Sequence, residues 1–344
     1  MTINATVHSE YPLERTLESL AADQHEPSDL WRRYLMTKEY LGGQFYPWVQ
    51  ASCPWYTDHG EKHVEAVIEA AGSLLAPAFQ AERADRLDCM ALYCLLMGIL
   101  WHDVGMVSGR SGHAKKVAEM TDQVKRIAFP NPSVQGHVAR IAAAHSGEDG
   151  LQSVDLEADF TGTHRTHTIF PRALAALLRF ADELSDDQRR VSQSLLDMNS
   201  VPDRARIYWE YARCVAAVRP DPARGRVIVT IEVQRDTAHR QFPCTDYPTR
   251  TVRGHVSLIE YIVCRLEKMN NERCYCSPHF LRYTSPIDEI EVRFSMYSGG
   301  ERVPEYDFTE VIANEPPYRH SALFDGFFLR HPLWSASSLQ EAHP

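Results

Sequence analysis

The sequence lacks the features that mark a secreted, membrane-spanning or nucleic-acid-binding protein. Residues 1–20 contain neither a basic start nor an apolar stretch, so no secretory signal is expected. The longest apolar run, residues 91–101, is too short to span a bilayer. The formal net charge is -10, whereas a protein that binds nucleic acid through its overall field would be basic. We therefore expect a cytoplasmic protein with no membrane partner, and nucleic acid is not the expected ligand.

Cysteine patterns typical of structural zinc or of a disulfide framework are also missing. The chain has 8 cysteines without regular spacing, and Cys274 and Cys276 form their one close pair. Because no second pair completes a zinc knuckle, we expect reduced and mostly buried thiols. There is no internal repeat and no low-complexity segment. The 344 residues suffice for one large domain or two moderate ones.

Hydrophobic periodicity separates a helical part of the chain from a mixed part. Residues 226–233 and 289–297 alternate apolar and polar side chains, which predicts half-buried strands, and residues 255–273 between them form an amphipathic helix. The predicted fold class is mainly α, a helical bundle with a smaller α+β C-terminal region. The predicted division is a helical lead-in over residues 1–50, a helical domain over residues 51–200 and an α+β region over residues 201–344.

Histidines and aspartates fall on the buried faces of successive predicted helices. His63 lies on the apolar stripe of a helix predicted over residues 56–75. His102 and Asp103 stand at the end of a helix that is apolar nearly all round, and Gly105 is expected to stop that helix. A buried histidine and a buried carboxylate are costly unless something pairs them, and a divalent metal would do so.

Three further residues continue this pattern along the next predicted helices. His113 and Asp182 each share a stripe with apolar residues, and His145 ends the stripe of a helix that Asn131 is predicted to cap. Any one of them alone would be explained by a hydrogen bond or by an ion pair with an arginine. Their coincidence favours a metal site instead. The predicted metal ligands are His63, His102, Asp103 and Asp182. His113 and His145 are further candidate ligands.

The order H…HD…D resembles the HD-domain superfamily of metal-dependent phosphohydrolases. The residues that carry the resemblance are His63, the segment LLMGILWHDVG with His102 and Asp103, and the segment LLRFADELSDD with Asp182. It covers about residues 45–200 and implies an HD-type helical bundle with one divalent metal on those four ligands. Two-metal members of the superfamily add histidines at places where His113 and His145 stand. The later α+β region is similar to the extension of some bacterial HD proteins.

The resemblance also implies a reaction and further residues. A bound metal would activate water and neutralise phosphoryl charge, with Asp103 counted in the catalytic group. His59, placed one turn before His63 on the same helix, is similar to the first histidine of cyclic-nucleotide phosphodiesterases and would protonate the leaving oxygen. The candidate substrate-binding residues are Arg110, Lys116 and Arg172. A small phosphorylated molecule, specifically a nucleotide, is the expected substrate.

Other readings of the same residues stay open. Some relatives of the HD fold hold two irons with four histidines and two aspartates and oxidise their substrate. A second alternative is a module that senses a nucleotide without turnover, and an HD nuclease would need a basic channel that the composition does not show. The identity of the metal is left open among manganese, iron, zinc, magnesium, nickel and cobalt, and so is the number of ions, one or two. Whether the chain forms a homo-oligomer is also left open.

Overall fold

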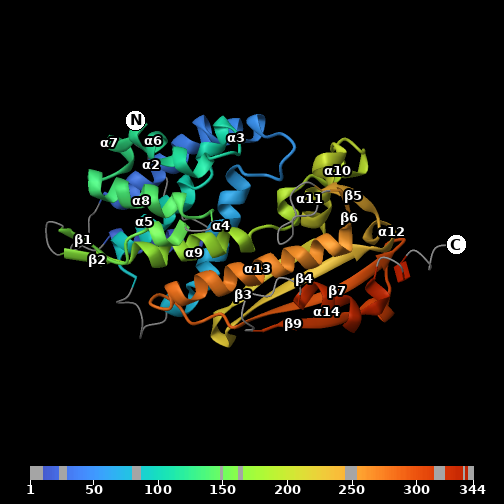
Figure 1. Cartoon of the computed structure of the whole chain (residues 1–344). Coiled ribbons are helices and arrows are strands. Elements are labelled where there is room, and N and C mark those ends of the chain that lie inside the picture. Colours follow the sequence, from blue (N-terminus) through green and yellow to red (C-terminus); the bar gives the residue numbers. More distant parts are fainter. Residues whose placement is uncertain are drawn as a thin grey trace. The chain divides into compact units, whose positions relative to one another are not determined.

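The computed structural model describes residues 11–22, 29–79, 87–147, 150–161, 166–244, 254–313, 322–335 and 338–339. Helices make up most of this part of the chain, and the longer strands occur after residue 214 (Figure 1). The fold is therefore mainly α with a smaller α+β part, as the sequence predicted.

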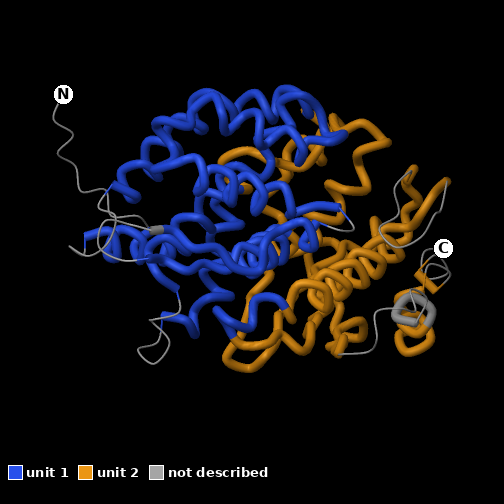
Figure 2. The backbone as a smooth tube through the Cα atoms, turned by 60° about the vertical axis from the view of Figure 1, so that its left-hand side comes forward, with its two compact units in different colours: residues 1–53, 64–182, 279–284 blue, residues 54–63, 183–278, 285–344 orange. Residues whose placement is uncertain are grey.

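The chain divides into two compact units (Figure 2). Unit 1 contains residues 1–53, 64–182 and 279–284, and unit 2 contains residues 54–63, 183–278 and 285–344. The division passes through two helices, after His63 in α4 (Glu61–Leu74) and after Asp182 in α9 (Pro171–Leu184). The two units are defined by contacts between residues, and they do not test the domain boundaries proposed from the sequence. Those boundaries stay predictions.

Helix α5 (Cys89–Trp101) is the centre of unit 1. All of its residues are buried, and it contacts α1, α2 and α8. Its N-terminus is capped by Asp88, whose Oδ1 accepts a hydrogen bond from the Ala91 backbone N–H at 2.8 Å. The stretch Cys89–Ser108 has the length and apolar composition to cross a membrane, and 94% of its most apolar window is buried inside the fold.

The other described elements of unit 1 are further helices and a pair of short strands. They are α1 (Pro12–Ala21), α2 (Leu30–Gln44), α3 (Tyr46–Ser52), η1 (Ala76–Phe79), η3 (Val104–Ser108), α6 (His113–Gln123), α7 (Lys125–Ala128), α8 (Pro132–Ala143), η4 (Gly150–Ser153), β1 (Ala158–Thr161) and β2 (Thr166–Ile169). Strands β1 and β2 pair antiparallel. The predicted cap of α8 is confirmed, because the Asn131 side chain accepts from the Val134 N–H at 3.0 Å.

Unit 2 is organised by a sheet in the order β3 (Val215–Asp221), β4 (Arg226–Gln234), β7 (Glu289–Ser298), with β8 (Glu301–Arg302) and β9 (Phe308–Ile312) on β7. Strands β4 and β7 are parallel, and the other pairs are antiparallel. Alternate side chains of β4 are buried, as the period of two predicted, and those of β7 alternate as far as Phe294, after which Ser295 and Met296 are both buried. Parallel neighbours need a crossover connection, and the chain between them includes α13 (Leu258–Phe280), which runs along the sheet (Figure 1).

The start of α13 is fixed by a capping box. The Ser257 backbone N–H donates to the Glu260 carboxylate at 2.9 Å, and the Glu260 N–H donates to the Ser257 hydroxyl at 3.4 Å. The helix therefore begins later than the predicted residue 255. The other elements of unit 2 are η5 (Gln188–Arg190), α10 (Gln193–Asp197), α11 (Asp203–Cys214), η6 (Pro222–Arg224), α12 (Arg235–Ala238), β5 (Gln241–Cys244), β6 (Gly254–Ser257), η7 (Pro304–Tyr306), α14 (Ala322–Arg330) and η8 (Pro332–Trp334).

Two expectations about helix ends are wrong. Helix α4 begins at Glu61, so His59 precedes it instead of lying one turn earlier on it. The Asp58 side chain accepts from the Gly60 N–H at 2.9 Å, a local turn that competes with helical backbone hydrogen bonds. Gly105 is not a helix stop, because α5 ends at Trp101 and Gly105 lies inside η3.

Candidate metal centre

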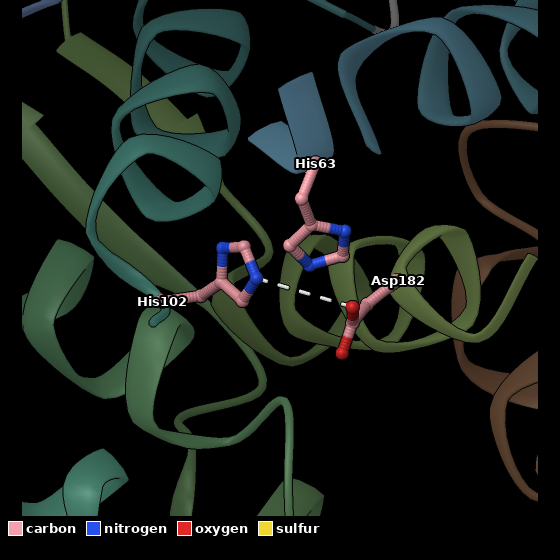
Figure 3. A group of neighbouring side chains, drawn as sticks. All are labelled: His63, His102 and Asp182. Atoms are coloured by element: carbon pink, nitrogen blue, oxygen red, sulfur yellow. Dashed lines mark ion pairs between the residues drawn. The ribbon is translucent and has the colours of Figure 1, made fainter. Parts of the chain in front are cut away.

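A first group of possible ligands comes from three helix ends. His63 lies in the first turn of α4, His102 directly follows α5, and Asp182 lies near the end of α9. Each offers one ligand atom, and these atoms all lie within 4.8 Å of one another. Figure 3 shows the two rings and the carboxylate facing a common point, with His102 Nε2 3.9 Å from Asp182 Oδ1. Both histidines are buried.

A second group consists of Asp103, His113 and His145. Asp103 Oδ1 lies 3.3 Å from His113 Nε2 and 3.5 Å from His145 Nε2. The two Nε2 atoms are 3.0 Å apart. Asp103 and His145 are buried, and His113 is partly exposed at the start of α6.

The Asp103 carboxylate stands between the two groups. Its Oδ2 lies 3.2 Å from His102 Nε2, whereas its Oδ1 faces His113 and His145. Six residues of the expected types therefore come together in one neighbourhood, and one carboxylate offers an oxygen to each side.

The spacing of the second group suits a divalent cation. Bonds of about 2.0–2.2 Å to imidazole nitrogen and carboxylate oxygen would leave the ligand atoms about 3–3.5 Å apart. The Nδ1 atoms of His113 and His145 face the carbonyls of Arg110 and Ala142, at 2.8 and 2.7 Å. Because carbonyls only accept, each Nδ1 must carry its proton, which turns two Nε2 lone pairs toward each other. Two lone pairs that face each other repel, unless the two Nε2 atoms share a cation or one of them carries a proton.

The charges of the site shift its pKa values strongly. Burial by itself lowers the pKa of His102, but the neighbouring carboxylates of Asp103 and Asp182 outweigh it and raise this pKa to about 9. Burial tends to raise the pKa of Asp103, and hydrogen bonds and charge from His102, His113 and His145 hold it well below its ordinary value. A cation bound here would take the place of the proton on His102.

The other site residues predicted from the sequence lie in the following places. The His59 ring centroid is 5.6 Å from that of His63, and its Nδ1 lies 2.5 Å from the Thr57 carbonyl. Arg110 is exposed. Lys116 Nζ donates to the Ser108 carbonyl at 3.3 Å, and Arg172 Nε donates to the Val154 carbonyl at 3.0 Å. The catalytic and substrate-binding roles of these four residues stay predictions.

Sequence reasoning did not predict the contacts that two residues, Ser185 and Arg179, make at the site. Ser185 Oγ lies 3.3 Å from His63 Nδ1, although the two residues are 122 positions apart. Arg179, one turn before Asp182, donates to the Gly147 carbonyl at 2.5 Å and so holds the segment that follows His145. The motif LLRFADELSDD contains both residues, but nothing in a single sequence shows which distant atoms they meet.

Comparison with known proteins identifies the family. The chain matches the HD-CE family model over residues 53–257, which is more than half of its length. No curated protein matches it, and no solved structure does. The matched range contains His63, the His102-Asp103 pair and Asp182, and these are the residues on which the resemblance to HD proteins rests. The chain therefore belongs to the HD-CE family, which is related to the HD domain.

Proposed function

We propose that this chain is a metal-dependent phosphohydrolase that acts on a small phosphate ester or anhydride, and specifically on a nucleotide. The observation that carries the proposal is the placing of the Asp103 carboxylate between two groups of ligand atoms. A divalent ion held there would lower the pKa of water towards neutrality and neutralise charge on a phosphoryl oxygen. Manganese, iron and zinc suit these mixed imidazole and carboxylate ligands.

His59 is the proposed general acid. Its ring lies beside that of His63, outside helix α4, and the Thr57 carbonyl orients its Nδ1. A carbonyl only accepts, so Nδ1 keeps its proton; in the imidazolium form Nε2 carries the second proton, and that is the proton His59 would give to a leaving oxygen. Histidine is the side chain that most often serves as a general acid.

Arg110 and Lys116 are proposed to hold the remaining phosphate charge. The Arg110 carbonyl accepts from the His113 imidazole, so the exposed Arg110 side chain starts from the loop that orients this proposed ligand. Lys116 follows His113 by three residues in α6, on the same side of the helix. Arg172 has less to support it, because its described contacts are to the backbone carbonyls of Val154 and Gln152.

The test is phosphate release from a panel of nucleoside mono-, di-, tri- and cyclic phosphates by chelator-treated chain reloaded with manganese, magnesium, iron or zinc. We expect release with at least one pair of metal and substrate. Asp103→Ala and Asp182→Ala should lose activity at least 100-fold, since both remove a carboxylate from the proposed centre. Asp155→Ala, at a half-exposed aspartate paired with Arg140, is the matched control and should keep full activity.

The same panel separates the alternatives. The proposal would be contradicted if the metal-loaded chain released no phosphate from any substrate and if Asp103→Ala and Asp182→Ala kept their metal content. Two tightly bound irons with oxygen consumption would instead favour a di-iron oxygenase. Tight nucleotide binding without turnover would favour a sensing module. The metal content of the variant His113→Ala shows whether the centre holds one ion or two, because a two-metal centre should lose one ion when this ligand is removed.

A further inference from the structure

The histidines of the proposed centre are oriented through their Nδ1 atoms. In three of them, Nδ1 faces the backbone carbonyl three residues earlier, at 2.7 to 2.8 Å: His102 with Ile99, His113 with Arg110 and His145 with Ala142. A carbonyl has no proton to give, so it selects the tautomer that leaves the Nε2 lone pair for a metal. Side-chain substitution in these partners would leave the carbonyls in place.

His63 is oriented differently. Its Nδ1 lies 3.3 Å from the Ser185 hydroxyl, which is fully buried. Figure 3 shows that the other ring nitrogen of His63, the one not bonded to Cγ, faces His102 and Asp182. If Nδ1 donates its proton to the Ser185 oxygen, Nε2 offers its lone pair to that common point.

The segment that carries Ser185 is held by ion pairs within unit 2. Glu183 and Asp186 flank it, and Arg265 of α13 reaches both carboxylates, at 3.2 and 2.9 Å. Lys268, one turn further along α13, also pairs with Glu183. Charged groups that are mostly buried and paired on several sides keep a defined geometry, because separating them would leave a charge without compensation.

We infer that Ser185 is a positioning residue for His63, which holds the imidazole so that its Nε2 side faces His102 and Asp182, and that Arg265 and Lys268 of α13 hold Ser185 in place for this task. The inference rests on the proposed function to the extent that it takes His63 as a metal ligand.

The test is metal affinity, measured by Co²⁺ titration of the chelator-treated full chain, with the visible absorption of bound Co²⁺ as the signature of its ligands. Ser185→Ala removes only the hydroxyl. We expect about 10- to 100-fold weaker binding at the group that contains His63, together with an altered spectrum, which is the usual cost of losing such a supporting hydrogen bond. Ser185→Thr keeps a hydroxyl and should restore affinity to within a few-fold of the unchanged chain.

Two further variants separate positioning from folding. Ser295→Ala removes another buried serine hydroxyl, on β7 of the same unit, and should leave Co²⁺ binding unchanged. Lys268→Met, at a side chain that is one third exposed, should weaken binding in the same direction as Ser185→Ala but less. Thermal unfolding of each variant shows that it is folded.

The outcomes bear on the inference and on the proposed function separately. If the Ser185→Ala variant is folded and binds Co²⁺ with unchanged affinity and an unchanged spectrum, the inference is overturned, whatever the activity of the variant. Weaker binding in Ser185→Ala with rescue by threonine would support it even if no phosphate release were found. A chain that binds no Co²⁺ at all would overturn both the inference and the metal-dependent function.

Discussion

At the scale of single residues, Gly105 shows how tightly the second ligand group is built. A Cβ atom added to Gly105 would lie 2.1 Å from the His113 carbonyl oxygen, far inside any real contact. The neighbour is backbone, so it cannot turn away as a side chain could. The absence of a side chain at residue 105 therefore allows the start of α6, with His113, to approach Asp103.

Gly105→Ala should push the start of α6 away and separate His113 from Asp103. We expect a loss of about 1–3 kcal/mol in the free energy of unfolding, as for other overpacked sites. In chelator-treated and reloaded protein, elemental analysis should find less metal per chain. Gly43→Ala, in α2 with no atom within 4 Å of the added Cβ, is the control and should keep full metal content. Equal metal content in both variants would contradict this account of Gly105.

The sequence predicted which ionisable residues lie together better than it predicted the residues that support them. Side-chain type and helical phase were enough to pick out His63, His102, Asp103 and Asp182, because a polar group on an apolar stripe is visible in one helix alone. The same reasoning added His113 and His145. Ser185 and Gly105 were missed or misread, because their roles are contacts with residues far along the chain or in the next element. A local pattern carries no information about such contacts.

At the scale of elements, the strands of the sheet were predictable and the ends of several helices were not. Strands β4 and β7 match their predicted ranges closely, because their period of two is long and unbroken. The predicted start of α4 was wrong, since the turn at Asp58 depends on local hydrogen bonds that compete with those of the helix. That error matters for His59, which precedes the helix and is oriented by Thr57.

The connection between the end of α9 and α13 makes an acid-sensitive element. Burial tends to raise the pKa of Asp186, but Arg190, Arg265, Lys268 and His59 outweigh it, so this pKa lies below its ordinary value. A carboxyl group whose pKa is lower in the folded than in the unfolded chain stabilises the fold above the unfolded pKa, about 3.9. That contribution disappears as the pH falls through the folded pKa.

Asp186→Asn should therefore reduce the free energy of unfolding by about 1–3 kcal/mol near pH 7, the range for a hydrogen-bonded charge. The difference from the unchanged chain should shrink as the pH falls below about 4. Urea unfolding of metal-free protein between pH 3 and pH 7 measures both. Asp122→Asn is the control, because Asp122 is exposed beside Lys125, where solvent screens the pair, and it should show only a small difference at any pH. A difference that does not change with pH would contradict this role of Asp186.

At the scale of the whole molecule, the candidate centre gathers residues that are distant in the sequence, from His63 to Asp182. The fold class and the family followed from the sequence, because they depend on the order of helices and motifs. The sharing of Asp103 between two ligand groups did not, since it depends on how the ends of α5, α6 and α8 converge. Such convergence is set by packing, which one sequence does not reveal.

Because the unfolded chain cannot hold these ligands together, metal binding should stabilise the folded state. At a free metal concentration about 100 times the dissociation constant, the gain is about 2.7 kcal/mol. With an unfolding entropy of about 2.1 cal/mol/K per residue, each kcal/mol raises the midpoint of thermal unfolding of a chain of 344 residues by about 1.4 °C. We therefore expect chelator-treated protein to unfold about 4 °C lower than protein reloaded with manganese or zinc, as measured by scanning calorimetry.

Chelation should lower this temperature without unfolding the chain. Helix α5 and its neighbours form a core that does not depend on the metal ligands, since every residue of α5 is buried. The treated protein should therefore keep a cooperative transition and regain the higher midpoint when metal is added back. Asp103→Ala, which removes the carboxylate common to both groups, should show little or no rise. A rise as large in Asp103→Ala as in the unchanged chain would mean that the metal stabilises the fold from another place.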